Sequence, residues 1–175
     1  QVHRLTKEAC HLPLREATIV FNNGEHGKTA VLQAAKALPH HARPSALNRW
    51  LQWLEAWTPP TFPMPPLALC RNDANWRNFV RQNGRFHSVD WENSGWGDPA
   101  FEMADLITHP AYETVPEQRW QEIPALYAEL SGDKTAVLRI QTYTKLMLIW
   151  WLIRWSRYLY EIPRGLDQRL VERPA

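Results

Sequence analysis

Apolar residues recur at a helical spacing over most of the chain, whereas strand-like alternation is confined to its middle. Large apolar residues at every third or fourth position predict helices over 45–57 and 134–161. The segment 29–38 is also typical of a helix. A further helix is expected to begin with Asp98 as its cap and Pro99 in its first turn. The pattern therefore predicts an α+β protein that is mainly α.

The last predicted helix has an apolar stripe that we expect to be buried. The stripe consists of Val137, Ile140, Thr144, Met147, Leu148, Trp151, Trp155 and Tyr158. All positions from Leu146 to Ile153 are apolar, which predicts burial on every side of the helix there. This run is far shorter than the ~20 residues needed to cross a membrane. Trp150 and its aromatic neighbours Trp151, Trp155 and Tyr158 are expected to pack in the core, and the alternative is an aromatic wall for a cationic ligand.

A β-hairpin is predicted in the middle of the chain. A short apolar run indicates a strand over 67–70, following a proline-rich connector over 58–66. The pair Asn83-Gly84 then lies within a run of alternating character, which is the strongest short-range signal of a hairpin. A two-residue turn at this pair places Asn78 opposite Val89, at the open end of the hairpin.

Three oxygen-bearing side chains are expected to meet at that open end. Asp73 lies five residues before Asn78, in the loop that leads into the hairpin, and Asp90 follows its second strand. Mg²⁺ prefers carboxylate and amide oxygens together with the phosphates of a substrate. Phosphoryl transfer also needs a carboxylate that orients and deprotonates the accepting hydroxyl. The three side chains therefore suit phosphoryl transfer.

The order of these motifs resembles the aminoglycoside phosphotransferase and choline kinase superfamily, whose members have a protein-kinase-like fold. The D-x4-N spacing, the hairpin, V-D-W-E and G-D-P-A-F-E-M-A follow one another in the family's order within residues 67–106. Carried over position by position, the resemblance implies that Asp73 is the catalytic base. It also implies that Asn78 and Asp90 bind Mg²⁺ and, with it, ATP or GTP.

Two positions depart from the family's pattern. Arg71 stands where the family has His in H-G-D or H-N-D, and Glu102 stands where it has Asp in D-L-A. The family's His mainly packs and orders the backbone, so its exchange removes no metal ligand. Glu92, two residues after Asp90, either reaches a second metal or the substrate, or pairs with a nearby arginine.

The resemblance covers the larger, C-terminal lobe of the kinase-like fold. No G-x-G-x-x-G loop and no V-A-I-K-like strand precede Asp73. We therefore expect the N-terminal β lobe to belong to a longer parent chain, and the isolated chain to be inactive because half of its ATP pocket is absent. One domain is expected, with strand, helices and connector in 1–66 and the hairpin and last helices in 67–175.

A second pattern raises the alternative of a P-loop. The apolar run 17–21 predicts a strand, and NNGEHGKT over 22–29 leads from it into a helix. Asn22 stands where G-x4-G-K-[ST] requires its first glycine, and no parallel strands are predicted downstream. We therefore expect a plain strand–turn–helix connection with Lys28 on the surface.

Composition narrows the setting of the protein. The chain has 175 residues, of which 45% are hydrophobic, and this is enough for one domain with a core. Its formal net charge of +2 gives no electrostatic reason to expect nucleic acid or membrane partners. Cys10 and Cys70 form neither a metal-binding spacing nor a disulfide framework, which favours a reduced, cytoplasmic setting.

Three functions are therefore compared. The favoured one is an ATP- and Mg²⁺-dependent phosphotransferase acting on a hydroxyl of a small molecule, such as an aminoglycoside, choline or a similar amino alcohol. The alternative is a non-catalytic kinase-like module that binds a ligand or partner, which the exchange at Arg71 favours. The third is a P-loop nucleotide-binding protein that uses Lys28 and Thr29.

Overall fold

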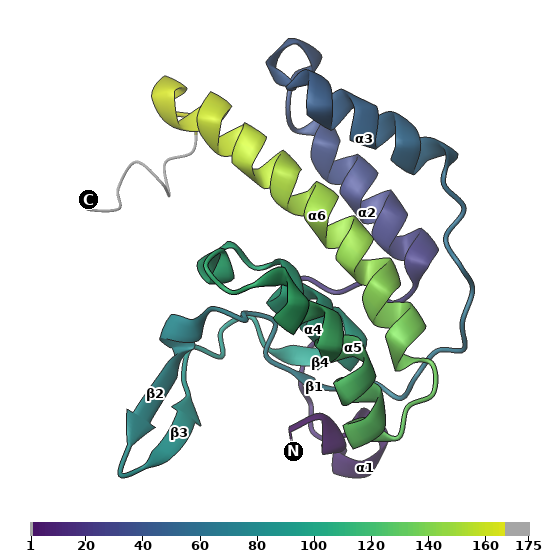
Figure 1. The fold of residues 1–175 in the computed structure, drawn as a ribbon, viewed down its shortest axis with the longest axis vertical. Coiled ribbons are helices and arrows are strands. Elements are labelled where there is room, and N and C mark those ends of the chain that lie inside the picture. Colours follow the sequence, from purple (N-terminus) through teal and green to yellow (C-terminus); the bar gives the residue numbers. More distant parts are fainter. Residues whose placement is uncertain (1, 167–175) are drawn as a thin grey trace.

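A computed structural model describes residues 2–166, and most of them are helical (Figure 1). The α-helices are α1 (Lys7–Cys10), α2 (Gly24–Lys36), α3 (Ser45–Ala56), α4 (Pro99–Thr108), α5 (Glu117–Ser131) and α6 (Ala136–Glu161). The strands are β1 (Ala68–Cys70), β2 (Phe79–Gln82), β3 (Arg85–Ser88) and β4 (Gly95–Gly97). Short 3-10 turns are η1 (Val2–Arg4), η2 (His40–Ala42), η3 (Trp76–Asn78), η4 (Pro110–Tyr112) and η5 (Ile162–Arg164). The predicted mainly α class is confirmed.

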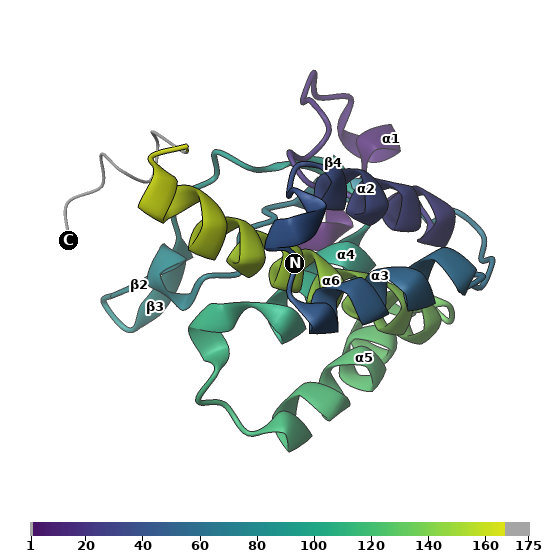
Figure 2. The ribbon, with the colours of Figure 1, turned by 90° about the horizontal axis from the view of Figure 1, so that it is seen from above.

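Helix α6 runs through the centre of the molecule. It packs against α2, α4 and α5, and Figures 1 and 2 show α2 and α5 on opposite sides of it. The core forms where these helices meet, and its largest aromatic members are Phe21, Phe101 and Tyr143, each at most 1% exposed. Burial of these rings stabilises the arrangement, because apolar area is removed from water on both sides of α6.

The buried face of α6 differs from the predicted stripe. Ile140 and Met147 are buried as predicted, whereas Leu148 is 57% exposed and Trp155 is 51% exposed. The other buried apolar residues of α6 are Ala136, Tyr143, Leu146, Ile149 and Ile153. Because the packed neighbours cover only part of the helix circumference, the predicted burial on every side of 146–153 is wrong.

A buried ion pair joins α4 to α6. Asp98 caps α4 as predicted, since its Oδ1 accepts a hydrogen bond from the N–H of Ala100 at 2.9 Å. Arg139 Nε donates to Asp98 Oδ2 at 2.8 Å, and the Tyr143 hydroxyl donates to the same oxygen at 3.0 Å. Asp133 Oδ2 lies 2.7 Å from Nη2 of Arg139. These bonds offset the desolvation of two buried charges and fix α4 against the central helix.

The small sheet of β1 and β4 lies beneath α4. The strands are antiparallel, with Ala68 opposite Gly97 and Cys70 opposite Gly95. The predicted strand near 67–70 is confirmed, but β4 has no strand-like pattern. A Cβ atom at Gly95 would lie 2.5 Å from the carbonyl oxygen of Arg15, so only glycine lets the N-terminal segment pass this close.

The predicted hairpin forms from β2 and β3 and projects from the helical body (Figure 1). Its turn residues Asn83 and Gly84 have φ angles of 51° and 75°, as a two-residue type I′ turn requires. The N–H of Val89 donates to the carbonyl of Asn78 at 2.9 Å. Asn78 therefore lies opposite Val89, and the predicted register is confirmed.

The prediction of a strand over 17–21 is wrong. The only pairing there is an isolated parallel bridge between Glu16 and Trp96, within the described residues 2–166. The apolar side chains of the segment enter the helical core instead, where Phe21 lies 4.8 Å from Phe101 between ring centroids. An apolar run of this length cannot by itself distinguish a strand from a buried irregular segment.

The glycine-rich segment 22–29 does not form a phosphate-binding loop. Helix α2 begins within it, at Gly24, and Asn23 caps its first turn by accepting from the N–H of His26 at 2.8 Å and from the N–H of Gly27 at 3.0 Å. The Lys28 ammonium donates to the carbonyl oxygens of Glu55 at 2.9 Å and Trp57 at 2.7 Å. Lys28, which was predicted to lie on the surface, is half-buried and caps the C-terminal end of α3.

Two expectations from composition are also tested. Cys10 and Cys70 are both free thiols, in agreement with the absence of a disulfide framework. Within residues 2–166, no helix is both long enough and apolar enough to cross a membrane.

Candidate active site

The loop over residues 71–78, called the Asp73 loop below, brings Asp73 and Asn78 together. Asn78 Nδ2 donates to Asp73 Oδ2 at 2.9 Å. The 3-10 turn η3 folds the chain back between the two residues, as their spacing predicted. Asp73 Oδ1 accepts from the N–H of Asn75 at 3.2 Å. Because Asn78 uses its Nδ2 for Asp73, its Oδ1 is left as the atom that could bind a cation.

Two acids of α4 hold the backbone of the Asp73 loop. Glu102 Oε2 accepts from the N–H of Arg71 at 2.8 Å, and Asp105 Oδ2 accepts from the N–H of Ala74 at 3.3 Å. The Tyr112 hydroxyl donates to the carbonyl of Ala74. The backbone on both sides of the candidate base is therefore positioned by α4 and the turn that follows it.

Glu102 also connects the site to the start of the chain. His3 Nε2 lies 3.2 Å from Glu102 Oε2, and His3 Nδ1 lies 3.0 Å from the Tyr127 hydroxyl. Burial alone would raise the pKa of Glu102, but the bonds from His3 and the Arg71 N–H hold it below its usual value. Glu102 is therefore an ionised acceptor that fixes the loop. This role is compatible with its longer side chain at a position where the related family has Asp.

Asp105 is a buried acid that the sequence analysis missed. Burial raises its pKa to about 6, the Ala74 N–H bond opposes the rise, and the nearby charges of Asp73 and Glu102 add to it. One signal in the sequence could have identified it. Glu102 and Asp105 are three apart in a predicted helix, so both face the same neighbour.

Arg71 is buried beside the hairpin. It is 4% exposed, and its Cζ lies 4.6 Å from the ring centroid of Phe79. Its Nη1 has no hydrogen-bond partner in the described part of the chain. The guanidinium is thus packed on an aromatic ring, with its charge near the acids of α4.

Asp90 lies at the mouth of the hairpin, next to the pair formed by Val89 and Asn78. It is exposed, and none of the ion pairs within residues 2–166 includes it. Its φ of 60° is a left-handed backbone conformation that Asp tolerates better than most residues. No hydrogen bond or ion pair joins its carboxylate to Asp73 or Asn78 within residues 2–166, so the structure brings together only two of the three predicted side chains. Carboxylate and amide oxygens are the donors that Mg²⁺ prefers.

The carboxylate of Glu92 does not pair with an arginine among residues 2–166, and its contact with a second metal or the substrate stays a prediction. Arg15 donates to the backbone carbonyl of Glu92, and its carboxylate is not part of any ion pair among residues 2–166. The predicted pairing with an arginine therefore involves the main chain of Glu92 only.

A cavity of about 280 Å³ opens beside Asp73 and is called the Asp73 cavity below. Its lining includes Asn72, Asp73 and Asn75 of the loop, Asp105 and His109, and Trp150, Trp151 and Arg154 of α6. Two of the four predicted aromatic residues of α6 therefore line a cavity next to the candidate base. Trp155 is half exposed, so core packing is wrong for that residue.

The aromatic faces near this cavity are occupied by an arginine of the same helix. Arg154 Cζ lies 5.7 Å from the ring centroid of Trp151 and 5.2 Å from that of Tyr158. His109 packs edge-on against Trp151 at 5.3 Å. Burial lowers the pKa of His109, and the charge of Arg154 lowers it further against the opposing effect of Asp73, so His109 is neutral at pH 7.

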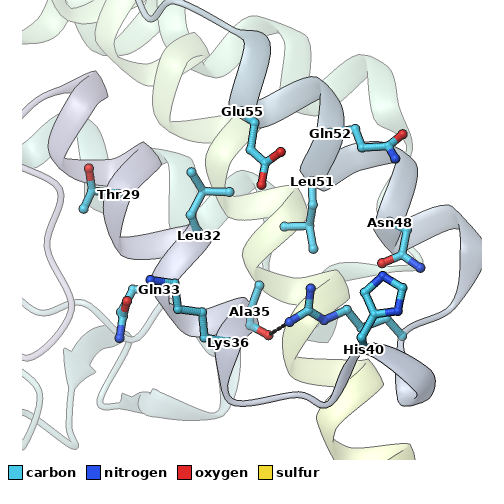
Figure 3. Close-up of a pocket in the computed structure, with 11 residues that line it drawn as sticks. Thr29, Leu32, Gln33, Ala35, Lys36, His40, Asn48, Leu51, Gln52 and Glu55 are labelled. Carbon is cyan, nitrogen blue, oxygen red and sulfur yellow. Dashed lines mark hydrogen bonds between the residues drawn. The ribbon is translucent and has the colours of Figure 1, made fainter.

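A larger hollow of about 750 Å³ lies between α2 and α3 (Figure 3). Figure 3 shows polar side chains from both helices around it, including Gln33, Lys36 and Glu55. Arg43 closes one side by donating to the carbonyl of Ala35 at 2.9 Å. This hollow contains no residue of the Asp73 loop and is therefore separate from the candidate active site.

Comparison with known proteins gives one match. The model of the phosphotransferase enzyme family matches residues 1–139, which include the Asp73 loop, the hairpin and α4. The resemblance found in the motifs is thereby confirmed. Searches of curated proteins and of solved structures gave no match.

Proposed function

Because the chain belongs to the phosphotransferase enzyme family, we propose that it carries the catalytic centre of an ATP- and Mg²⁺-dependent phosphotransferase that acts on a hydroxyl of a small molecule. The observation that supports this most is the 2.9 Å contact between Asp73 and Asn78, in a loop held by two acids of α4. A base and a metal ligand that are positioned together before the substrate arrives are what phosphoryl transfer requires.

Asp73 acts as the base in this proposal. Each of its oxygens accepts one hydrogen bond in the structure, from Asn78 Nδ2 and from the Asn75 N–H, and a carboxylate oxygen can accept more than one. The acceptor hydroxyl donates to Asp73, which orients the hydroxyl oxygen towards the γ-phosphorus and takes its proton as the new P–O bond forms. The bond from the γ-phosphorus to the bridging oxygen breaks at the same time, and the nucleoside diphosphate leaves. The carboxylate cannot rotate freely because both of its oxygens are bonded.

Asn78 Oδ1 and the carboxylate of Asp90 hold the metal. Mg²⁺, when bound, neutralises charge on the nucleotide phosphates. The nucleotide is ATP or GTP.

The Asp73 cavity binds the acceptor. The family resemblance gives aminoglycosides, choline and similar amino alcohols as candidate classes. A volume of about 280 Å³ lies at the small end of the range for ligand sites, which favours a small amino alcohol over an aminoglycoside.

A second candidate is a non-catalytic kinase-like module. The observation that favours it is the buried Arg71, whose Nη1 lacks a partner within residues 2–166, at the position where the family has His. Such a module would bind nucleotide or ligand without turnover.

The proposed metal site is tested by the thermal stability of the full-length protein. Mg²⁺ or Mn²⁺ added with nucleotide should raise its Tm, because a ligand that binds only the folded state stabilises it. Asp90→Ala should abolish this rise. Lys28→Ala is the matched control for the P-loop alternative and should retain it, with nucleotide affinity within about twofold of the unmodified protein, because Lys28 caps α3. A rise that Asp90→Ala leaves unchanged contradicts the metal assignment.

A further inference from the structure

The Asp73 cavity contains a cationic side chain that no acid of the described chain neutralises. Arg154 lines the cavity and is exposed, and none of the ion pairs within residues 2–166 includes it. By contrast Arg157, on the next turn of α6, is paired with Glu161 at 2.7 Å. The charge of Arg154 is therefore available to a molecule that enters the cavity.

The guanidinium of Arg154 is held in place by aromatic rings. It lies 5.7 Å from the ring centroid of Trp151 and 5.2 Å from that of Tyr158. Stacking on rings uses the faces of the planar group and leaves its N–H donors in the plane of the guanidinium. These donors form a fork that matches two oxygens of a carboxylate or a phosphate.

Other polar atoms at the cavity also lack partners. Trp151 Nε1 and Asn72 Oδ1 are buried and have no hydrogen-bond partner in the part of the chain that the structure describes. Buried polar atoms are normally satisfied. Both atoms are closed off from solvent, so they belong to the wall of the cavity, and Arg154 is the polar group that an occupant can reach.

We infer that the phosphoryl acceptor carries an anionic group, a carboxylate or a phosphate, in addition to its hydroxyl, and that Arg154 binds this group. The inference rests on the proposed function, since it takes the cavity beside Asp73 as the acceptor site. It also changes the expected acceptor. A quaternary ammonium such as choline would meet aromatic faces that Arg154 already covers, and its charge would be repelled by the guanidinium.

An amino alcohol that also bears a carboxylate has a partner for each kind of charge that lines the cavity. Its ammonium group would pair with an acid, Asp73 or Asp105, and its carboxylate with Arg154. The acids repel an anion, so Arg154 is the favourable partner of the anionic group. The hydroxyl is then directed to the candidate base.

Two pairs of probes test the inference by calorimetric titration of the full-length protein without nucleotide. L-serine and ethanolamine differ only in a carboxylate, and glycerol 3-phosphate and glycerol differ only in a phosphate. The anionic member of at least one pair should bind about tenfold or more tightly than its partner, because a charge-assisted contact to arginine forms with that member alone. The pair that shows the preference identifies the anion as carboxylate or phosphate.

Arg154→Gln should remove this preference. Arg164→Gln is the matched control and should retain it, because Arg164 also stacks on a ring, that of Tyr160 at 4.2 Å, but does not line the cavity. Equal affinity within both pairs, tighter binding of ethanolamine, or no binding of either anionic probe would overturn the inference.

These experiments distinguish a failure of this inference from a failure of the proposed function. If the unmodified protein transfers phosphate to a hydroxyl but shows no preference for the anionic probes, or if Arg154→Gln keeps the preference, only the role of Arg154 is rejected. Binding of the anionic probes through Arg154 without phosphoryl transfer to any hydroxyl rejects the proposed catalysis only.

Discussion

Asp105 lies one turn after Glu102 on α4, and the residue is 7% exposed. Within residues 2–166 its carboxylate accepts one hydrogen bond, the long one from the Ala74 N–H at 3.3 Å. The neighbouring charges of Asp73 and Glu102 oppose a third negative charge. The site therefore keeps an acid whose ionisation is unfavourable, at the point where the backbone of the Asp73 loop is held.

Replacing this acid should stabilise the fold at neutral pH. The folded pKa of Asp105 is raised from 3.8 to about 6, so the folded state binds more protons than the unfolded state between these values. Stability is then lost as pH rises through this window, by up to about 3 kcal/mol. Asp105→Asn keeps an acceptor oxygen for the Ala74 N–H and removes the charge.

Denaturant unfolding over a series of pH values measures this effect. The gain in the free energy of unfolding of Asp105→Asn over the unmodified protein should grow between about pH 4 and pH 6 and level off above. A gain that does not change with pH, or a loss at neutral pH, would show that burial does not destabilise the charged form of Asp105.

Prediction from sequence succeeded at this scale where the contact is local. The five-residue spacing of Asp73 and Asn78 was sufficient to predict that these two side chains meet. The turn at Asn83 was sufficient to predict the register of the hairpin. The partners of the loop backbone were not predicted, because Asp105 and Glu102 lie 31 residues from Ala74 and Arg71. Contacts at such separations depend on how α4 packs, which no local pattern encodes.

At the scale of elements, α4 is the support of the site, and the buried pair of Asp98 and Arg139 fixes α4 to α6. Both residues are at most 1% exposed, and Tyr143 adds a third bond. The role of Asp98 as a helix cap was predictable from the Asp-Pro pair. Its partner Arg139 was not, because it lies 41 residues away and interrupts an otherwise apolar face.

Breaking this pair should cost far more stability than breaking an exposed one. Arg139→Met leaves Asp98 as an uncompensated buried charge, which is expected to lower the free energy of unfolding by about 3–5 kcal/mol. Arg157→Met is the matched control on the same helix. Its ion pair with Glu161 joins positions four apart, Arg157 is 36% exposed, and the expected loss is at most about 1 kcal/mol.

Denaturant unfolding of the two variants under one condition gives the comparison. If the free energy of unfolding falls by similar amounts in the two variants, Asp98 is hydrated or finds another hydrogen-bond donor. In that case α4 is not held through Arg139.

At the scale of the whole molecule, α6 is shared by the core and the candidate acceptor site. One part of its surface contributes Ile140 and Ile153 to the core, and its C-terminal half contributes Trp151 and Arg154 to the Asp73 cavity. The sequence predicted the extent of this helix well. It did not predict which face is buried, because an apolar stripe is broad and the positions of α2, α4 and α5 decide what is covered.

Two glycine-rich segments show that tertiary packing can override the backbone structure that a local pattern predicts. The near P-loop had a plausible local order of strand, turn and helix, but the expected strand is absent from residues 17–21 and the turn is helical. The segment containing Gly95 had no recognisable pattern, yet it forms the strand that pairs with β1. In both cases, packing against a distant part of the chain determines the backbone.

The most direct test of the central claim is the turnover of the full-length protein with Asp73→Asn. Asparagine keeps the shape of the side chain and one acceptor oxygen, but it cannot take the proton of the acceptor hydroxyl. The account predicts that kcat for phosphoryl transfer falls by about 10²–10⁴-fold while nucleotide affinity stays almost unchanged. A variant that retains the kcat of the unmodified protein, or a protein that transfers phosphate to no hydroxyl acceptor before or after the exchange, would contradict the assignment of Asp73 as a catalytic base.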